Sequence, residues 1–107
     1  MNRRFIILPR AAADLREQRD YIAQDSVRAA ERFLSAAEEA FARLSEMPRM
    51  GAVRPVRSPR LGGIRQWSIR GFEKHLIFYR ETEAGIEVIR VLHSARDVHR
   101  VLEEETE

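Results

Sequence analysis

IEVIRVLHSARD, residues 86–97, places a strand that is apolar on both faces directly before a group of polar side chains. The first seven residues predict the strand, and strict alternation divides its apolar side chains between two faces: Ile86, Val88 and Leu92 on one, Ile89 and Val91 on the other. Such a strand is expected in the interior of a sheet, with a covering layer on each side. We therefore interpret the rest of the chain as the structure that surrounds this strand.

The end of this strand carries the first candidate site residues. His93 and Arg96 arrive where the strand gives way to a loop, and Asp97 follows them. Functional groups often lie at such a junction, because the strand fixes their position. Arg90, within the strand itself, is the third candidate in this stretch.

The composition bounds the class of protein. A chain of 107 residues makes one domain, 1–107, that is large enough to bury a core. Cysteine is absent, so disulfides and thiolate metal sites are excluded. The longest apolar run is four residues, far short of a membrane span. We expect a soluble, cytoplasmic protein with no metal, no cofactor and no contact with a membrane.

The net charge of +2 hides an asymmetry. Residues 49–80 contain eight basic side chains and one acid, which leaves 11 basic and 16 acidic residues elsewhere. This segment is either a solvated surface or a surface that meets a polyanion or an acidic protein. Arginine suits both partners, because its planar fork binds phosphate and carboxylate alike. The candidate binding residues here are Arg57, Arg60, Arg65 and Arg70.

The first half of the chain predicts a strand and two helices. Residues 4–8 form the strand, and Pro9 closes it. Residues 10–23 have a helical pattern, in which Asp14 is assigned to the solvated face. Ser26 suits the N-cap of a second helix, residues 27–47. Two helices joined so tightly are expected to form an antiparallel hairpin.

The second half predicts a meander. A connection rich in proline, glycine and arginine, residues 48–63, precedes strands at 64–69 and 75–80 and the strand quoted above. A short helix is expected at 95–103. The fold class is α+β, with an N-terminal strand, a helical hairpin, a three-stranded antiparallel meander and a short C-terminal helix. The helices cover one sheet face, and we expect the other face to lack a cover within this chain.

Four features in this order resemble the RelE/ParE superfamily of toxins from type II toxin–antitoxin systems. They are ADL at 13–15 with DYIA at 20–23, the break Pro48…Gly51, HLIFYR at 75–80, and RVLHSARD at 90–97. The last three are similar to the ParE branch, often described as plasmid stabilisation proteins. The resemblance covers nearly the whole chain and implies the fold predicted above.

The resemblance also implies partners and an activity. RelE-like toxins cut messenger RNA on the ribosome, whereas ParE-like toxins poison DNA gyrase by binding and do no chemistry of their own. In both branches a cognate antitoxin neutralises the toxin in a hetero-oligomer. That antitoxin is the expected cover for the bare sheet face. No sequence-specific DNA binding by the toxin alone is expected.

The choice between the two activities depends on a proton-transfer group. Arg70 and Arg96 fall at the positions of the RelE-branch arginines, but the position of its C-terminal tyrosine, near Leu102, is apolar. In a ribonuclease His93, or else His99, would have to replace that tyrosine as acid or base. The missing tyrosine favours gyrase inhibition, with RNA cleavage through Arg70, Arg96 and His93 as the alternative. A non-toxic scaffold that only binds an antitoxin is a third interpretation.

Overall fold

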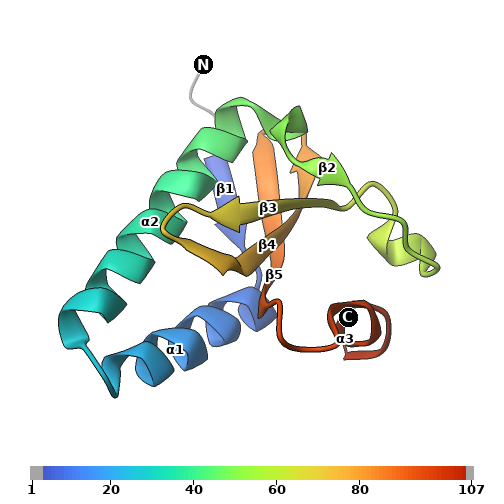
Figure 1. The fold of residues 1–107 in the computed structure, drawn as a ribbon. Coiled ribbons are helices and arrows are strands. Elements are labelled where there is room, and N and C mark those ends of the chain that lie inside the picture. Colours follow the sequence, from blue (N-terminus) through green and yellow to red (C-terminus); the bar gives the residue numbers. More distant parts are fainter. Residues whose placement is uncertain (1–3, 106–107) are drawn as a thin grey trace.

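The structure is a computed structural model that describes residues 4–105 (Figure 1). It confirms the α+β class and the predicted order of the main elements. The elements are β1 (Arg4–Ile7), α1 (Pro9–Ala23), α2 (Val27–Glu46), the 3-10 turn η1 (Pro48–Met50), β2 (Ala52–Val53), the 3-10 turn η2 (Pro59–Leu61), β3 (Arg65–Ile69), β4 (Phe72–Thr82), β5 (Gly85–His93) and α3 (Val98–Glu105).

The strands form one sheet in the order β1-β5-β4-β3-β2. β1 pairs with β5 in parallel, and the other neighbouring strands are antiparallel. β5 therefore lies inside the sheet, as its apolar sequence predicts. Gly85 opens β5 opposite Arg4 with a φ of 151°, and a Cβ there would overlap the Arg4 carbonyl oxygen. Only glycine allows β1 to lie so close.

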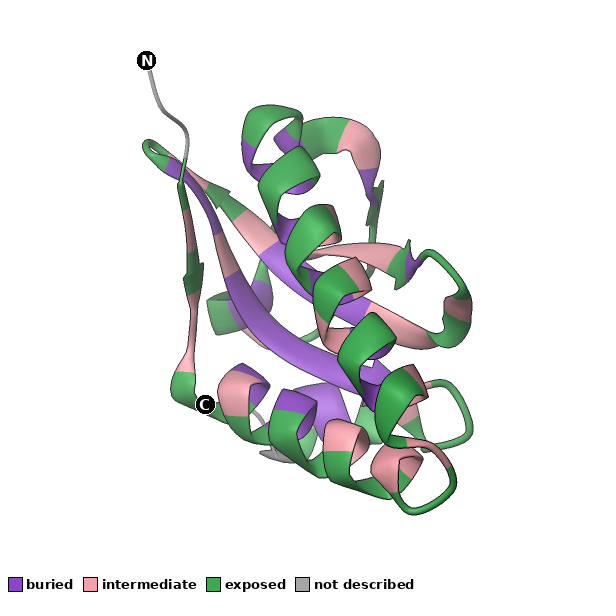
Figure 2. Ribbon diagram, turned by 90° about the vertical axis from the view of Figure 1, so that its left-hand side faces the viewer, coloured by how far each residue is buried: buried purple, intermediate pink, exposed green. Residues whose placement is uncertain are grey.

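The first face of the sheet is covered by α1 and α2. Their apolar stripes meet Ile77, Ile86 and Val88 of the sheet in one buried cluster, which includes Phe33 and Phe41 of α2. Figure 2 shows the buried residues on the inner sides of the helices and along the sheet, while the outer sides of the helices are exposed. The Ser26 hydroxyl accepts the Ala29 N–H at 3.0 Å, which confirms the predicted N-cap of α2.

The second face of the sheet is also covered, so the prediction of a bare face is wrong. Here α3 and the segment 54–64 pack on the sheet. The buried side chains of this second cluster are Leu61, Ile64, Phe78, Ile89, Leu92, Val101 and Leu102. The apolar residues of 54–64 stand singly among prolines, glycines and arginines, so periodicity gave no sign of a covering layer. A bare sheet face therefore no longer argues for a protein partner.

A bulge in β5 corrects the predicted alternation. Tyr79 pairs with Val88 and Phe78 pairs with Arg90, which leaves Ile89 as an extra residue. Beyond the bulge the faces are exchanged. Val91 therefore joins Ile86 and Val88 under the helices, while Ile89 and Leu92 lie in the second cluster.

The remaining differences concern boundaries and the connection 48–63. This connection contains η1, the edge strand β2 and η2, none of which was predicted. β4 is longer than the predicted strand at 75–80, since it begins at Phe72 directly after a tight turn. α3 begins at Val98, three residues later than expected. The periodicity of apolar residues predicts where an element lies but not where it ends, because the ends of helices fray.

Candidate functional site

Arg90, a predicted binding residue, is buried inside the fold. Its guanidinium bonds the carboxylate of Asp14 on α1 twice, with Nε 2.7 Å from Oδ2 and Nη2 2.9 Å from Oδ1. Oδ2 also accepts the Val91 N–H at 3.0 Å. Arg90 is 2% exposed and Asp14 is 7% exposed. The assignment of Asp14 to a solvated face is therefore wrong, and we withdraw Arg90 from the candidate binding residues.

Gln18 of α1 forms hydrogen bonds with both β5 and His75 of β4. Its amide Nε2 donates to the Val91 carbonyl oxygen at 2.7 Å, so its Oε1 is left to accept a hydrogen bond from Nδ1 of His75, also at 2.7 Å. The His75 ring lies edge-on to His93, with 4.8 Å between ring centroids. Burial, assisted by the neighbouring His93, lowers the pKa of His75 to about 4. His75 is therefore neutral at physiological pH.

His93 is half-buried at the end of β5 and has a structural bond of its own. Its Nδ1 accepts the Ala95 N–H at 3.0 Å, which shapes the turn after the strand. The Arg96 N–H bonds the His93 carbonyl oxygen at 3.1 Å, and the Arg96 side chain is exposed. The strand end thus holds His93 and Arg96 next to each other, as predicted.

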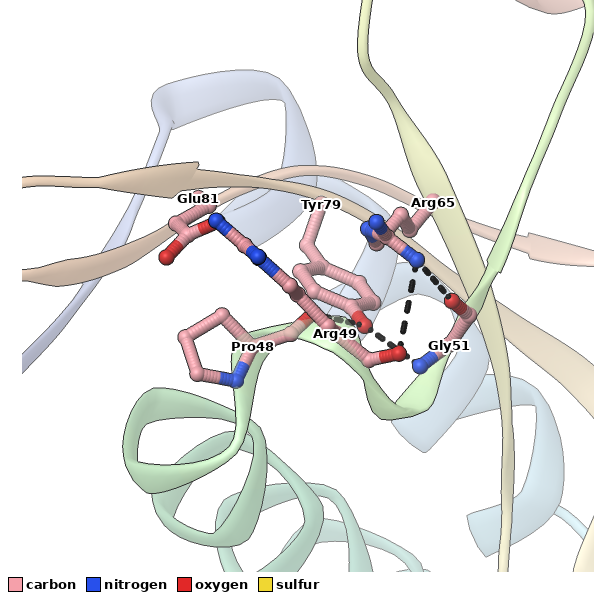
Figure 3. Close-up of polar contacts among 6 residues, drawn as sticks. All are labelled: Pro48, Arg49, Gly51, Arg65, Tyr79 and Glu81. Atoms are coloured by element: carbon pink, nitrogen blue, oxygen red, sulfur yellow. Dashed lines mark hydrogen bonds and ion pairs between the residues drawn. The ribbon is translucent and has the colours of Figure 1, made fainter.

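Tyr79 ties the sheet to the loop after α2 (Figure 3). Its hydroxyl donates to the Pro48 carbonyl oxygen at 2.7 Å and accepts the Gly51 N–H at 2.8 Å. Burial raises the pKa of Tyr79, so the hydroxyl keeps its proton. A Cβ on Gly51 would overlap this hydroxyl, so Gly51 is needed for space. The Pro48…Gly51 break and the strand at 75–80, two of the sequence motifs, are one structural unit.

At least four of the eight basic side chains in 49–80 form hydrogen bonds or ion pairs within the molecule. The Arg65 guanidinium bonds the Gly51 carbonyl oxygen at 2.7 Å, as Figure 3 shows. The other bonds join Arg49 to Glu81, Arg54 to Gln66, and Arg80 to Glu87. Arg65, a predicted binding residue, is half-buried and holds the β2–β3 edge. Part of the charge asymmetry is therefore structural.

Arg57 and Arg60 lie on the segment that covers the second sheet face, and both are exposed. Glu103 of α3 fixes the backbone beneath them, because its carboxylate accepts the N–H groups of Arg57 and Ser58. These two bonds lower the pKa of Glu103. The buried side chain of Leu61 anchors the far end of the segment. The structure thus presents Arg57 and Arg60 outward from an anchored backbone.

Arg70 lies on the other side of the molecule, beside α2. Two adjoining hollows, the first of about 250 Å³, run between α2 and the β3–β4 turn, and both include Ala36, Glu39 and Arg70. We call this surface the α2 furrow. Its apolar lining is Ala36, Ala40, Ala42, Trp67 and Phe72, and its charged lining is Arg28, Glu31, Arg32, Glu39, Arg43 and Arg70. Neither hollow includes His93 or Arg96.

The hollows that include Arg70 do not include His93 or Arg96, the other two residues of the alternative ribonuclease site. Arg70 faces the α2 furrow, whereas His93 is bonded within the turn that follows β5. The Tyr79 hydroxyl is engaged by backbone groups. Within residues 4–105 there is also no group of three or more metal-binding side chains. The arrangement is one of arginines suited to binding anionic groups.

Four residues of structural or surface importance were missed or misjudged from the sequence. Asp14 stands three residues after Ala11 and directly before Leu15, both buried, and this spacing was the available sign that it faces inward. Gln18 continues the same helix face four residues later. Glu103 and Trp67 gave no comparable signal, because their partners are distant in sequence.

Comparisons with known proteins agree with this fold. A family model for the ParE toxin of type II toxin-antitoxin systems, parDE, matches residues 5–98. No curated protein matches the sequence. Among solved structures, a chain from the chromosomal ParDE TA system of P. aeruginosa is similar, with a TM-score of 0.67 and 22% identity. That alignment covers 86% of this chain and 96% of the other. No helix within residues 4–105 is long and apolar enough to cross a membrane.

Proposed function

This chain belongs to the ParE toxin family of type II toxin–antitoxin systems, and we propose that it is a toxin that inhibits DNA gyrase by binding and that a cognate antitoxin neutralises. The family match over residues 5–98 carries the proposal, since it includes both long helices and the whole of β5. The resemblance to the ParE branch implies that the toxin acts by binding its target and needs no catalytic group. The toxin and the antitoxin would form a hetero-oligomer.

The exposed arginines support action by binding. Arg57 and Arg60 lie on one side of the molecule, and Arg43 and Arg70 lie beside α2 on the other. Two separate basic surfaces suit a protein that meets two partners, because arginine pairs with carboxylate and phosphate alike. We assign the Arg57–Arg60 surface to the target, together with Arg96 and His93 at the end of β5.

The geometry gives less support to RNA cleavage. General acid–base catalysis needs a proton-transfer group within hydrogen-bond reach of the reacting atoms, beside the cations that stabilise the developing charge. Arg70 lies in the α2 furrow, and neither hollow of that furrow includes His93. The Tyr79 hydroxyl already bonds Pro48 and Gly51.

Expression of the chain without its antitoxin tests the proposal. We expect growth arrest with gyrase-dependent DNA breaks, inhibition of supercoiling by the purified protein, and intact messenger RNA. The variant His93→Gln with His99→Gln should keep most of this activity, because glutamine conserves hydrogen bonding and removes only the titration. A nuclease that uses either histidine should lose about a hundredfold or more.

Three results would contradict the proposal. Sequence-selective cuts in translated messages that disappear in the double histidine variant would establish the RNA-cleaving alternative. Growth arrest with normal supercoiling and intact messages would require another target. A folded chain that binds its antitoxin and never arrests growth would be the non-toxic scaffold.

A further inference from the structure

Residues 54–58 connect β2 to η2 and, within the described chain, lie outside every helix and strand. They belong to the segment that covers the second sheet face, on the same side of the sheet as α3 (Figure 1). Pro55 and Pro59 have no N–H, so the backbone between them offers only the three donors of residues 56–58. Such a connection loses much conformational entropy if a partner has to order it. The contacts that already hold it therefore affect how well its arginines can bind.

Glu103 of α3 accepts hydrogen bonds from two of these three donors. Its Oε2 accepts the Arg57 N–H at 2.5 Å, and its Oε1 accepts the Ser58 N–H at 3.1 Å. Both oxygens of one carboxylate thus hold two consecutive residues that are distant in sequence. Because these bonds lower the pKa of Glu103, the group is ionised at neutral pH, and hydrogen bonds to an ionised acceptor are the strong ones.

Arg80 of β4 holds the other end of the same stretch. Its Nη1 donates to the Arg60 carbonyl oxygen, and its Nη2 lies 2.7 Å from the Glu87 carboxylate on β5. Leu61, the next residue, is buried in the second cluster. We call residues 57–60 the arginine loop. Its backbone is fixed at one end from α3 and at the other from the sheet, while its two arginine side chains are exposed.

We propose that Glu103 and Arg80 are positioning residues of the target surface, and that they hold the arginine loop in the arrangement in which it meets an anionic surface of gyrase. This inference rests on the proposed function, because it takes gyrase as the target of that loop. A loop that is ordered before binding gives higher affinity, because the entropy cost of ordering it is met during folding.

The location of Glu103 favours this role over that of a brace for α3. Val101 and Leu102 already anchor α3, since both are fully buried in the second cluster. The Arg57 charge also contributes to the lowered pKa of Glu103, so the two charges attract each other. A carboxylate at this place weakens the attraction of an anionic target. Its two backbone bonds to the loop are the feature that offsets this disadvantage.

Glu103→Ala tests the proposal, because positioning and charge predict opposite results. Loss of the carboxylate makes the surface more positive, which alone would strengthen binding to an anionic target. Loss of positioning should instead weaken the inhibition of supercoiling by the purified protein at least about tenfold. The matched control is Glu104→Ala, which makes the same charge change at the neighbouring exposed residue of α3 and should inhibit at least as well as the unaltered protein.

Two further measurements show that the variant is folded and where it has changed. Urea denaturation should give a cooperative transition for Glu103→Ala, and hydrogen exchange should accelerate at the N–H groups of residues 57 and 58 while β5 stays protected. Glu103→Gln keeps one carbonyl oxygen as an acceptor and should inhibit to an intermediate degree. If Glu103→Ala does not fold, the comparison with Glu104→Ala is made with Glu103→Gln.

A mutant cycle distinguishes positioning from a general loss of structure. In a protein that already carries Arg57→Ala with Arg60→Ala, the further change Glu103→Ala should cause no additional loss of inhibition, because Glu103 acts through those two side chains. Arg80→Met should likewise weaken inhibition only while both arginines are present. Losses that simply add would show that Glu103 and Arg80 support the fold as a whole, and would overturn the inference.

The outcomes separate this inference from the proposed function. If the unaltered chain inhibits supercoiling and Glu103→Ala inhibits equally or better, the positioning role is wrong and the proposed function stands. If the unaltered chain leaves supercoiling intact, both are overturned. A tenfold loss in Glu103→Ala that Glu104→Ala does not share, and that disappears without the two arginines, establishes the positioning role.

Discussion

Asp14 and Arg90 form a buried ion pair that joins α1 to β5, an interior strand of the sheet, with Nε 2.7 Å from Oδ2. The same carboxylate accepts the Val91 N–H, beyond the point where β1 stops pairing with β5. Where the pairing with β1 has ended, side chains of α1 therefore form hydrogen bonds with the backbone of β5. This one carboxylate bonds both a buried charge and a buried backbone donor.

Asp14→Ala should therefore lower the free energy of unfolding by about 3–5 kcal/mol, because it removes the carboxylate that pairs with the buried charge of Arg90. Urea denaturation followed by circular dichroism measures the loss. The control is Asp20→Ala, which removes an exposed carboxylate paired with Arg19 and should cost less than about 1 kcal/mol. Equal losses of stability in the two variants would show that the buried ion pair stabilises the fold no more than an exposed one.

Tyr79→Phe should destabilise the fold by about 1–3 kcal/mol, since the buried Gly51 N–H and Pro48 C=O both lose their partner. Tyr21→Phe, on the exposed side of α1, is the matched control and should leave the denaturation midpoint unchanged. Below the unfolding transition, Tyr79→Phe should remain toxic. Loss of toxicity in a folded Tyr79→Phe variant would point to a chemical role for the hydroxyl.

Arg57→Glu with Arg60→Glu should abolish growth arrest and weaken supercoiling inhibition by more than about tenfold, because both side chains are exposed on the proposed target surface. Arg65 is left unchanged, since its bond to Gly51 supports the fold. Arg43→Glu with Arg70→Glu is the control and should remain toxic. Full toxicity of the first variant would reduce these arginines to a solubility feature.

The stability of the protein should fall as the pH is lowered from 7 toward 4. The pKa of His75 drops from 6.5 to about 4 on folding, so between these values the unfolded chain binds the extra proton. One proton limits the slope to about 1.4 kcal/mol per pH unit, and partial solvent access reduces it further. His75→Gln should show a shallower dependence in urea denaturation at pH 7, 6 and 5. An equally steep decline in that variant would assign the effect to other groups.

The long apolar patterns predicted most of the architecture. The apolar stripe of α2 predicts a helix packed on the sheet. The strand β5, apolar on both faces, predicts a strand in the interior of the sheet. Local chemistry gave the cap at Ser26. These features succeed because each depends on residues that are close in sequence.

The failures all involve partners that are distant in sequence. The cover formed by 54–64 depends on single apolar residues that meet α3, and the bulge at Ile89 depends on the register with β4. Two of the predicted binding residues were misjudged for the same reason. Arg65 and Arg90 look like surface cations in the sequence, and only Gly51 and Asp14, at separations of 14 and 76 residues, reveal them as structural.

The parallel pairing of β1 with β5 has a consequence for synthesis. Arg4 of β1 pairs with Gly85 of β5, so β1 stays unpaired during synthesis until the residues up to β5 have been made. Contacts of such long separation make folding slow, because the loop must close before the pairing stabilises it. An interrupted chain that ends before β5 lacks both the strand that joins β1 to β4 and the arginine that pairs with Asp14. Truncated translation products should therefore be unfolded and harmless, and activity should appear only with the completed chain.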